Sequence, residues 1–88
     1  MRDSDWKILD SLQRTGNITK TAMSLCLSQS AVTKRVQMME SELNVRILIR
    51  TSKGVFLTPA GQYLAGKAGE HMDFMEKVRR DLREMPDL

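Results

Sequence analysis

Three polar side chains lie close together in the sequence and could bond to the exposed edges of nucleic-acid bases. The amide of Gln29 can form two hydrogen bonds with adenine, and the ammonium group of Lys34 can donate to guanine. The methyl group of Thr33 can touch the methyl group of thymine. At helical spacing, Ser30 and Lys34 share one face, with Thr33 alongside and Gln29 in the first turn. These residues form a candidate surface for contacts to base pairs.

Positive charge surrounds this candidate surface. Residues 14–53 hold seven basic and two acidic side chains, a net charge of +5, whereas the whole chain carries +3. No carboxylate side chain occurs between Asp10 and Glu40, so an anion that faces this stretch meets little local repulsion. We therefore predict a polyanionic ligand, with phosphate contacts from backbone amides at the amino ends of two helices and from side chains. The side chains predicted to contact phosphate are Thr19, Lys20, Arg35, Arg50 and Thr58.

The sequence offers little for catalysis or metal binding. Cys26 is the only cysteine and His71 the only histidine, and they are far apart in the chain. No candidate nucleophile is paired with a base, which argues against a small enzyme, and we expect no cofactor and no metal. No apolar run approaches the roughly 18 residues that cross a bilayer, and the first residues show no apolar signal region. We expect a cytoplasmic protein without a membrane partner.

The predicted fold is mainly helical, and its first part must position the candidate surface. Apolar periodicity and helix-ending residues predict three helices, at residues 4–15, 18–26 and 29–43. Asn17 and Ser28 are the expected N-caps of the second and third helices, because their side-chain oxygens can accept backbone N–H bonds. Asn44 is expected to end the third helix in the left-handed conformation.

A β-hairpin and a long helix complete the predicted fold. Two β-rich runs, residues 47–49 and 55–57, flank a turn with Gly54 and predict a two-stranded wing. Thr58 is the expected N-cap of a final helix that begins at Pro59 and could extend to about residue 85, roughly 40 Å in length. Because three short helices and a hairpin are too small to cover the whole apolar stripe along this helix, we predict that a second copy of the chain pairs with it. The stripe residues predicted to form the dimer are Leu64, Ala68, Met72, Met75, Val78 and Leu82.

Residues 17–33 have the layout of a helix-turn-helix motif. Ala22 is small at the point where the two helices of such a motif cross closely. Together with residues 40–45, 50–51, 53–55 and 57–61, the motif resembles the amino-terminal domain of LysR-type transcriptional regulators. The resemblance covers nearly the whole chain, from about Trp6 into the final helix.

The resemblance implies a winged helix-turn-helix whose third helix enters the major groove of operator DNA. It implies a minor-groove contact from Lys53 at the tip of the wing. It also implies base contacts from Gln29, Ser30, Thr33 and Lys34. Family members pair through antiparallel linker helices, which would make this chain a homodimer. We accordingly divide it into a DNA-binding domain, residues 1–58, and a linker or dimerisation helix, residues 59–88.

The chain also departs from the family pattern. Members usually carry a much larger carboxy-terminal effector-binding domain, so we expect an excised fragment or a natural truncation without a small-molecule site. Ser30 replaces a frequent Pro, Thr21 replaces the usual Ala, and Asn44 replaces the usual Gly. Residues 47–50 differ from the customary sequence Leu-Phe-acid-Arg, which affects the packing under the wing.

Two classes of function remain open at this point. A dimeric regulator that binds specific double-stranded DNA should lose affinity steeply as salt is added, because phosphate contacts release counterions. The alternative is a protein-interaction module that uses the Met-rich final helix and has lost DNA binding.

Overall fold

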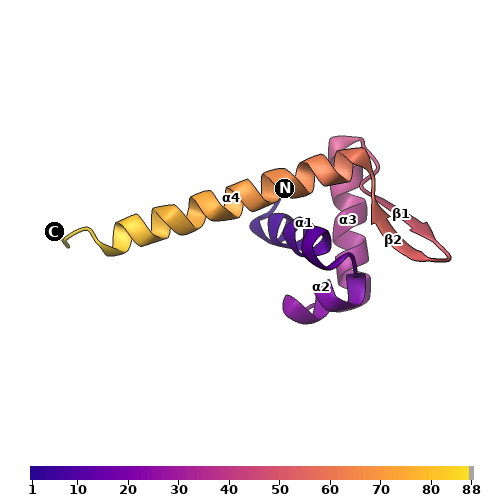
Figure 1. The fold of residues 1–88 in the computed structure, drawn as a ribbon, viewed down its shortest axis with the longest axis horizontal. Coiled ribbons are helices and arrows are strands. Elements are labelled where there is room, and N and C mark those ends of the chain that lie inside the picture. Colours follow the sequence, from indigo (N-terminus) through magenta and orange to yellow (C-terminus); the bar gives the residue numbers. More distant parts are fainter. Residues whose placement is uncertain (88) are drawn as a thin grey trace.

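The structure, a computed structural model, describes residues 1–87, in which four helices and one two-stranded sheet are arranged around a small core (Figure 1). Three short helices and the sheet form the body, and the long fourth helix crosses α1 and projects away from it (Figure 1). The predicted winged helix-turn-helix with a long final helix is confirmed. The elements are α1 (Asp3–Thr15), α2 (Ile18–Ser24), α3 (Gln29–Leu43), β1 (Leu48–Thr51), β2 (Gly54–Leu57) and α4 (Pro59–Arg83).

Polar side chains begin three of the helices, as predicted. The side-chain oxygens of Asn17, Ser28 and Thr58 each accept a hydrogen bond from the backbone N–H three residues later, at 2.9–3.0 Å. Each bond satisfies a donor at the start of a helix that has no partner within the helix. The starts of α2, α3 and α4 are therefore fixed by residues adjacent to them in the sequence.

The helix ends agree less closely with the sequence prediction. Asn44 ends α3 in the left-handed conformation, with a φ of 55°, as expected. The second helix was predicted to reach Cys26, but α2 ends at Ser24 because Cys26 adopts a φ of 57°. The N–H of Leu27 then donates to the carbonyl of Ala22 at 2.8 Å, which closes the turn between α2 and α3. The last helix was predicted to residue 85, whereas α4 ends at Arg83.

The core lies between α1, α3, the base of the wing and the first half of α4. Ala22 is buried where α2 crosses α3, as predicted. Ala65 and Ala68 are fully buried and allow α4 to approach α1 closely, because neither side chain extends beyond Cβ. The larger core side chains with no exposed surface are Ile8, Leu9, Val32, Met39 and Ile47.

The apolar stripe on α4 is shared between this core and the solvent. Ala68 has no exposed surface, so it cannot contact a second chain, and we correct the predicted dimer surface by removing it. Leu64 is half-buried and packs against the same core. Leu82, by contrast, is 60% exposed. Between these limits the stripe is half-buried at Met72, Met75 and Val78.

The wing is an antiparallel hairpin whose base is fastened to two helices. The strands pair in a register that sets Leu48 opposite Leu57. The carboxylate of Glu40, on α3, accepts the backbone N–H of Ile47 at 2.7 Å. The hydroxyl of Thr58 donates to the carbonyl of Arg46. These two bonds hold the hairpin beside the end of α3 and the start of α4.

Within residues 1–87, every helix is too short or too polar to cross a bilayer.

Candidate nucleic-acid interface

The predicted base-contacting residues lie on the open side of α3. Gln29, Ser30 and Lys34 are exposed, and Thr33 is half-buried. The opposite side of the helix packs into the core through Val32, Val36 and Met39. One side of α3 is therefore held by the protein, and the other is free to contact a ligand.

A polar cleft of about 370 Å³ joins this side of α3 to the wing and to the start of α2. Predicted DNA contacts from three parts of the sequence, separated by up to 34 positions, meet in it. Its lining includes residues of each predicted kind, those that contact bases, phosphates and the minor groove, and no acidic side chain. Ser30, Lys34 and Lys20 lie outside the lining. These predicted contacts are Thr19 on α2, Gln29 and Thr33 on α3, Arg50 on β1 and Lys53 in the wing turn.

The helix ends near the cleft favour an anion. Neither α2 nor α3 carries an acidic side chain in its first turn. The partial positive charge of unpaired backbone N–H groups at these ends is therefore not neutralised locally. Thr19 and Lys20 are exposed in the first turn of α2, where a phosphate oxygen could reach both side chains.

Three lysines near this surface are free of acidic partners. In the part of the chain that the structure describes, Lys20, Lys34 and Lys53 form no ion pair, whereas most cations of α1 and α4 are paired. An unpaired ammonium group offers its full charge to an incoming anion. Positive charge is therefore available on all three elements that surround the cleft.

A hydrogen bond connects the wing directly to α3. Nη2 of Arg50 donates to Oγ1 of Thr33 at 2.8 Å. The hydroxyl of Thr33 can still donate its own proton, and the guanidinium of Arg50 retains further N–H donors for a phosphate. The predicted phosphate contact at Arg50 and the predicted base contact at Thr33 are thus adjacent and compatible.

Arg35, also predicted to contact phosphate, is instead paired within the protein. Its Nε and Nη2 donate to the two carboxylate oxygens of Asp5 at 2.9 and 2.8 Å. The Asp5 side chain is fully buried, and that of Arg35 is 17% exposed. Burial alone would raise the pKa of Asp5, but hydrogen bonds from Arg35 and from the Arg2 backbone lower this pKa overall. We therefore correct the prediction: the charge of Arg35 is neutralised by a carboxylate.

Thr58 likewise has a role inside the fold. Its residue surface is only 9% exposed, and its hydroxyl both caps α4 and donates to the carbonyl of Arg46. Little of the hydroxyl remains for a phosphate oxygen, so we correct this prediction as well. The cap was predicted from the sequence, but the bond to Arg46 depends on how the wing folds back.

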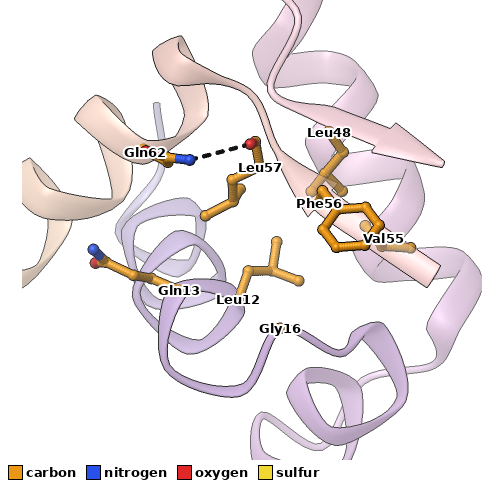
Figure 2. A pocket seen from close by; sticks show the side chains of 8 residues that line it. All are labelled: Leu12, Gln13, Gly16, Leu48, Val55, Phe56, Leu57 and Gln62. Carbon is orange, nitrogen blue, oxygen red and sulfur yellow. Dashed lines mark hydrogen bonds between the residues drawn. The ribbon is translucent and has the colours of Figure 1, made fainter. Parts of the chain in front are cut away.

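A second hollow lies between the end of α1, the wing and the start of α4 (Figure 2). It has a volume of about 360 Å³, and its walls are mostly the apolar side chains of Leu12, Leu48, Val55, Phe56 and Leu57. Figure 2 shows that its polar wall includes an amide, on Gln62, which donates to the Leu57 carbonyl at 3.5 Å. No charged side chain lines this hollow, so it lacks the cations that a phosphate requires, although it adjoins the polar cleft at Gly16 and Val55.

Comparison with known proteins adds independent information. The family model for "Bacterial regulatory helix-turn-helix protein, lysR family" matches residues 4–62. The HTH-type transcriptional regulator YofA of Bacillus velezensis is 36% identical over 87 residues, which cover 99% of this chain and 30% of that protein. The chain thus spans less than a third of the length of such curated relatives.

Solved structures of protein–DNA complexes share this fold. The crystal structure of a CbnR DBD–DNA complex matches with a TM-score of 0.85 and 26% identity, over 94% of this chain and 95% of that chain. The complex of BenM DBD with benA site 1 DNA matches with a TM-score of 0.89, over 98% of this chain and 100% of that chain. At 22% identity the BenM likeness concerns the fold alone.

Proposed function

Because the chain belongs to the lysR family of bacterial regulatory helix-turn-helix proteins, we propose that it binds specific double-stranded DNA as part of a dimeric transcriptional regulator. Its relatives are named as transcriptional regulators, and a matched structure with 26% identity is a DNA complex. DNA binding by a regulator, and not catalysis, is the function that these findings support. The alternative of a protein-interaction module without DNA binding is not favoured.

The observation that carries the proposal is the polar cleft. It is lined by predicted DNA contacts from α2, α3 and the wing, and acidic side chains are missing from its walls. A merely solvated polar face would not require α2, α3 and the wing to bring predicted contacts together in one concave surface whose charged side chains, Arg50 and Lys53, are both cations. Duplex DNA offers such a surface a row of phosphates and an adjacent groove.

We assign the contacts by position and chemistry. The amino-terminal part of α3 enters the major groove, where Gln29 and Lys34 bond to base edges, and Ser30 and Thr33 contribute further contacts. Lys53, at the tip of the wing, enters the neighbouring minor groove. Thr19, Lys20 and Arg50 contact phosphates and fix the position of α3 along the duplex. Arg35 and Thr58 are left out of this assignment because their polar groups are engaged within the protein.

The exposed part of α4 supports pairing with a second copy. In this proposal residues 1–58 contact DNA and residues 59–88 pair with the partner, while the first turns of α4 also pack on α1. The free stripe extends from Met72 to Leu82 and lies against an antiparallel helix of the partner. Two copies related by a twofold axis would contact two related half-sites. A regulator that binds the bacterial genome in this way acts in the cytoplasm.

The test is selection of bound duplexes from a random DNA pool, followed by affinity measurements at several salt concentrations. We expect enrichment of a site composed of two related halves. Lys20, Arg50 and Lys53 from two copies offer about six cationic contacts, so log affinity should fall against log salt concentration with a slope of roughly −5. Failure to enrich any sequence, together with affinity independent of salt, would exclude the proposed function and leave the protein-interaction module.

A further inference from the structure

The ion pair between Asp5 and Arg35 joins the first turn of α1 to the middle of α3. Two nearly equal bonds, of 2.9 and 2.8 Å, connect the guanidinium to both carboxylate oxygens. The backbone N–H of Arg2 also donates to the Asp5 carboxylate at 2.8 Å, so this carboxylate is fixed from its own helix as well. The pair is therefore a defined geometric link between the two helices and not a loose surface contact.

Such a link constrains α3 differently from its apolar contacts. The inner side of α3 is buried through Val32, Val36 and Met39. Apolar burial has no preferred direction, so small rotations of the helix cost little free energy. A bidentate bond between a planar guanidinium and a carboxylate has a preferred direction and distance. A buried ion pair adds little net stability relative to apolar packing, so stability alone does not account for this one.

The link is also close to the surface that contacts DNA. Arg35 directly follows Lys34 on α3 and comes two residues after Thr33, so its position fixes the turn that carries both side chains. Asp5 lies on α1, which packs along α4. The pair thus connects the base-contacting turn to the helix that is proposed to set the distance between two half-sites.

We propose that Asp5 and Arg35 are positioning residues, which hold α3 at the orientation required for discrimination between DNA sequences without contacting DNA themselves. This inference rests on the proposed function. It replaces the phosphate contact that the sequence predicted for Arg35 and gives Asp5 a role beyond the amino end of α1. It requires that loss of the pair weakens specific binding and leaves non-specific binding intact.

The experiment compares two duplexes of equal length, the one selected by the unchanged protein and a scrambled version. Asp5→Asn and Arg35→Gln should each reduce affinity for the selected duplex by roughly tenfold, the size of one lost base contact. Affinity for the scrambled duplex and its salt slope should not change. Lys20→Gln is the matched control, because a free cation at the interface should weaken both duplexes and reduce the magnitude of the salt slope by about 0.9 per copy.

Folding is checked by circular dichroism at the temperature of the binding assay. Arg35→Lys keeps the positive charge but lacks the planar guanidinium group. If Asp5→Asn and Arg35→Gln do not fold, this variant tests whether the ion pair is required for discrimination. We expect this variant to lose discrimination while it binds the scrambled duplex normally.

Two results would overturn the inference, and a third would exclude the proposed function on which it rests. Equal weakening of both duplexes by Arg35→Gln, with a smaller salt slope, would show a phosphate contact and overturn it. Full discrimination by folded Asp5→Asn and Arg35→Lys would overturn it as well. If the unchanged protein itself enriches no duplex, the proposed function fails, and that outcome is recorded before any variant is made.

Discussion

Gln29 is exposed at the amino end of α3 and lines the polar cleft. Its amide can form two bonds to adenine, so Gln29→Ala should weaken binding to the selected duplex by about 1–3 kcal/mol and leave the scrambled duplex unaffected. Fluorescence anisotropy with labelled duplexes measures both affinities. Gln13→Ala is the control, because Gln13 is exposed on α1 and lies outside the polar cleft. Equal losses on the two duplexes would remove Gln29 from the base-contacting residues.

The ion pair of Asp5 predicts how stability depends on pH. Burial opposes ionisation of this carboxyl, but bonds from Arg35 and Arg2 outweigh it and lower the pKa below the ordinary value of 3.8. The unfolded chain therefore binds the proton more tightly than the folded chain, and stability is lost as the pH falls through the folded pKa. The difference in unfolding free energy between the wild-type chain and Asp5→Asn should stay constant above about pH 5 and shrink below pH 3.8.

Urea unfolding between about pH 6 and pH 2.5 measures this difference. A difference that is the same at every pH would show that the carboxyl of Asp5 has equal pKa values in the folded and unfolded chains, contrary to the structure.

For single residues, the sequence predicted which side chains are exposed better than it predicted which side chains bond to one another. Gln29 and Lys34 could be placed on the open side of α3 because helical periodicity identifies the face opposite the core. The pairing of Arg35 could not be predicted, because its partner Asp5 lies 30 residues away and the choice depends on how α1 crosses α3. Thr58 was correctly predicted as a cap, but the sequence did not show that its hydroxyl is then also bonded to the wing.

Among the elements, the junction of the wing with α4 contains little free space. A Cβ atom added at Gly61 would collide with the carbonyl oxygen of Ile47 and approach Cδ2 of Leu57 to 3.1 Å. Gly61→Ala should therefore lower the free energy of unfolding by about 1–3 kcal/mol, the usual cost of overpacking, although alanine favours helices. Chemical denaturation at fixed protein concentration measures the change.

Gly66 provides the matched control five residues further along α4. A Cβ atom there would meet no other atom within 4 Å, so only the helix propensity changes. Gly66→Ala should raise the free energy of unfolding by about 0.5–1 kcal/mol. If both substitutions were stabilising, the wing would not lie against the start of α4 as the structure has it.

The elements themselves were predictable where their signals are local. The starts of α2, α3 and α4 followed from caps that lie next to them in the sequence. The end of α2 did not, because the left-handed turn at Cys26 occurs at a residue that does not ordinarily favour that conformation. Helical spacing also placed Ala68 on the stripe, but spacing cannot distinguish a neighbour in the same chain from one in a second copy.

For the whole molecule, the oligomeric state depends on the free part of the apolar stripe. Met75→Lys introduces a charge there and should yield monomers, because an unpaired ammonium group is costly to bury between helices. Light scattering gives the molar mass in solution. Asp73→Lys is the control, since Asp73 is exposed and lies roughly 160° around the helix from Met75. A dimer that persists in Met75→Lys would remove this part of α4 from the interface.

The extended shape of the molecule, 55 × 25 × 19 Å, has a thermodynamic consequence. His71 still contacts Trp6 of α1, but the last turns of α4 project from the body (Figure 1), and an isolated helix of about 12 residues is only marginally stable in water. Side-chain ion pairs such as Lys77 with Asp81 add only a few tenths of a kcal/mol. The far turns should therefore fray when the protein is diluted and re-form as it is concentrated, so that mass action controls the helix content of the chain as well as its assembly.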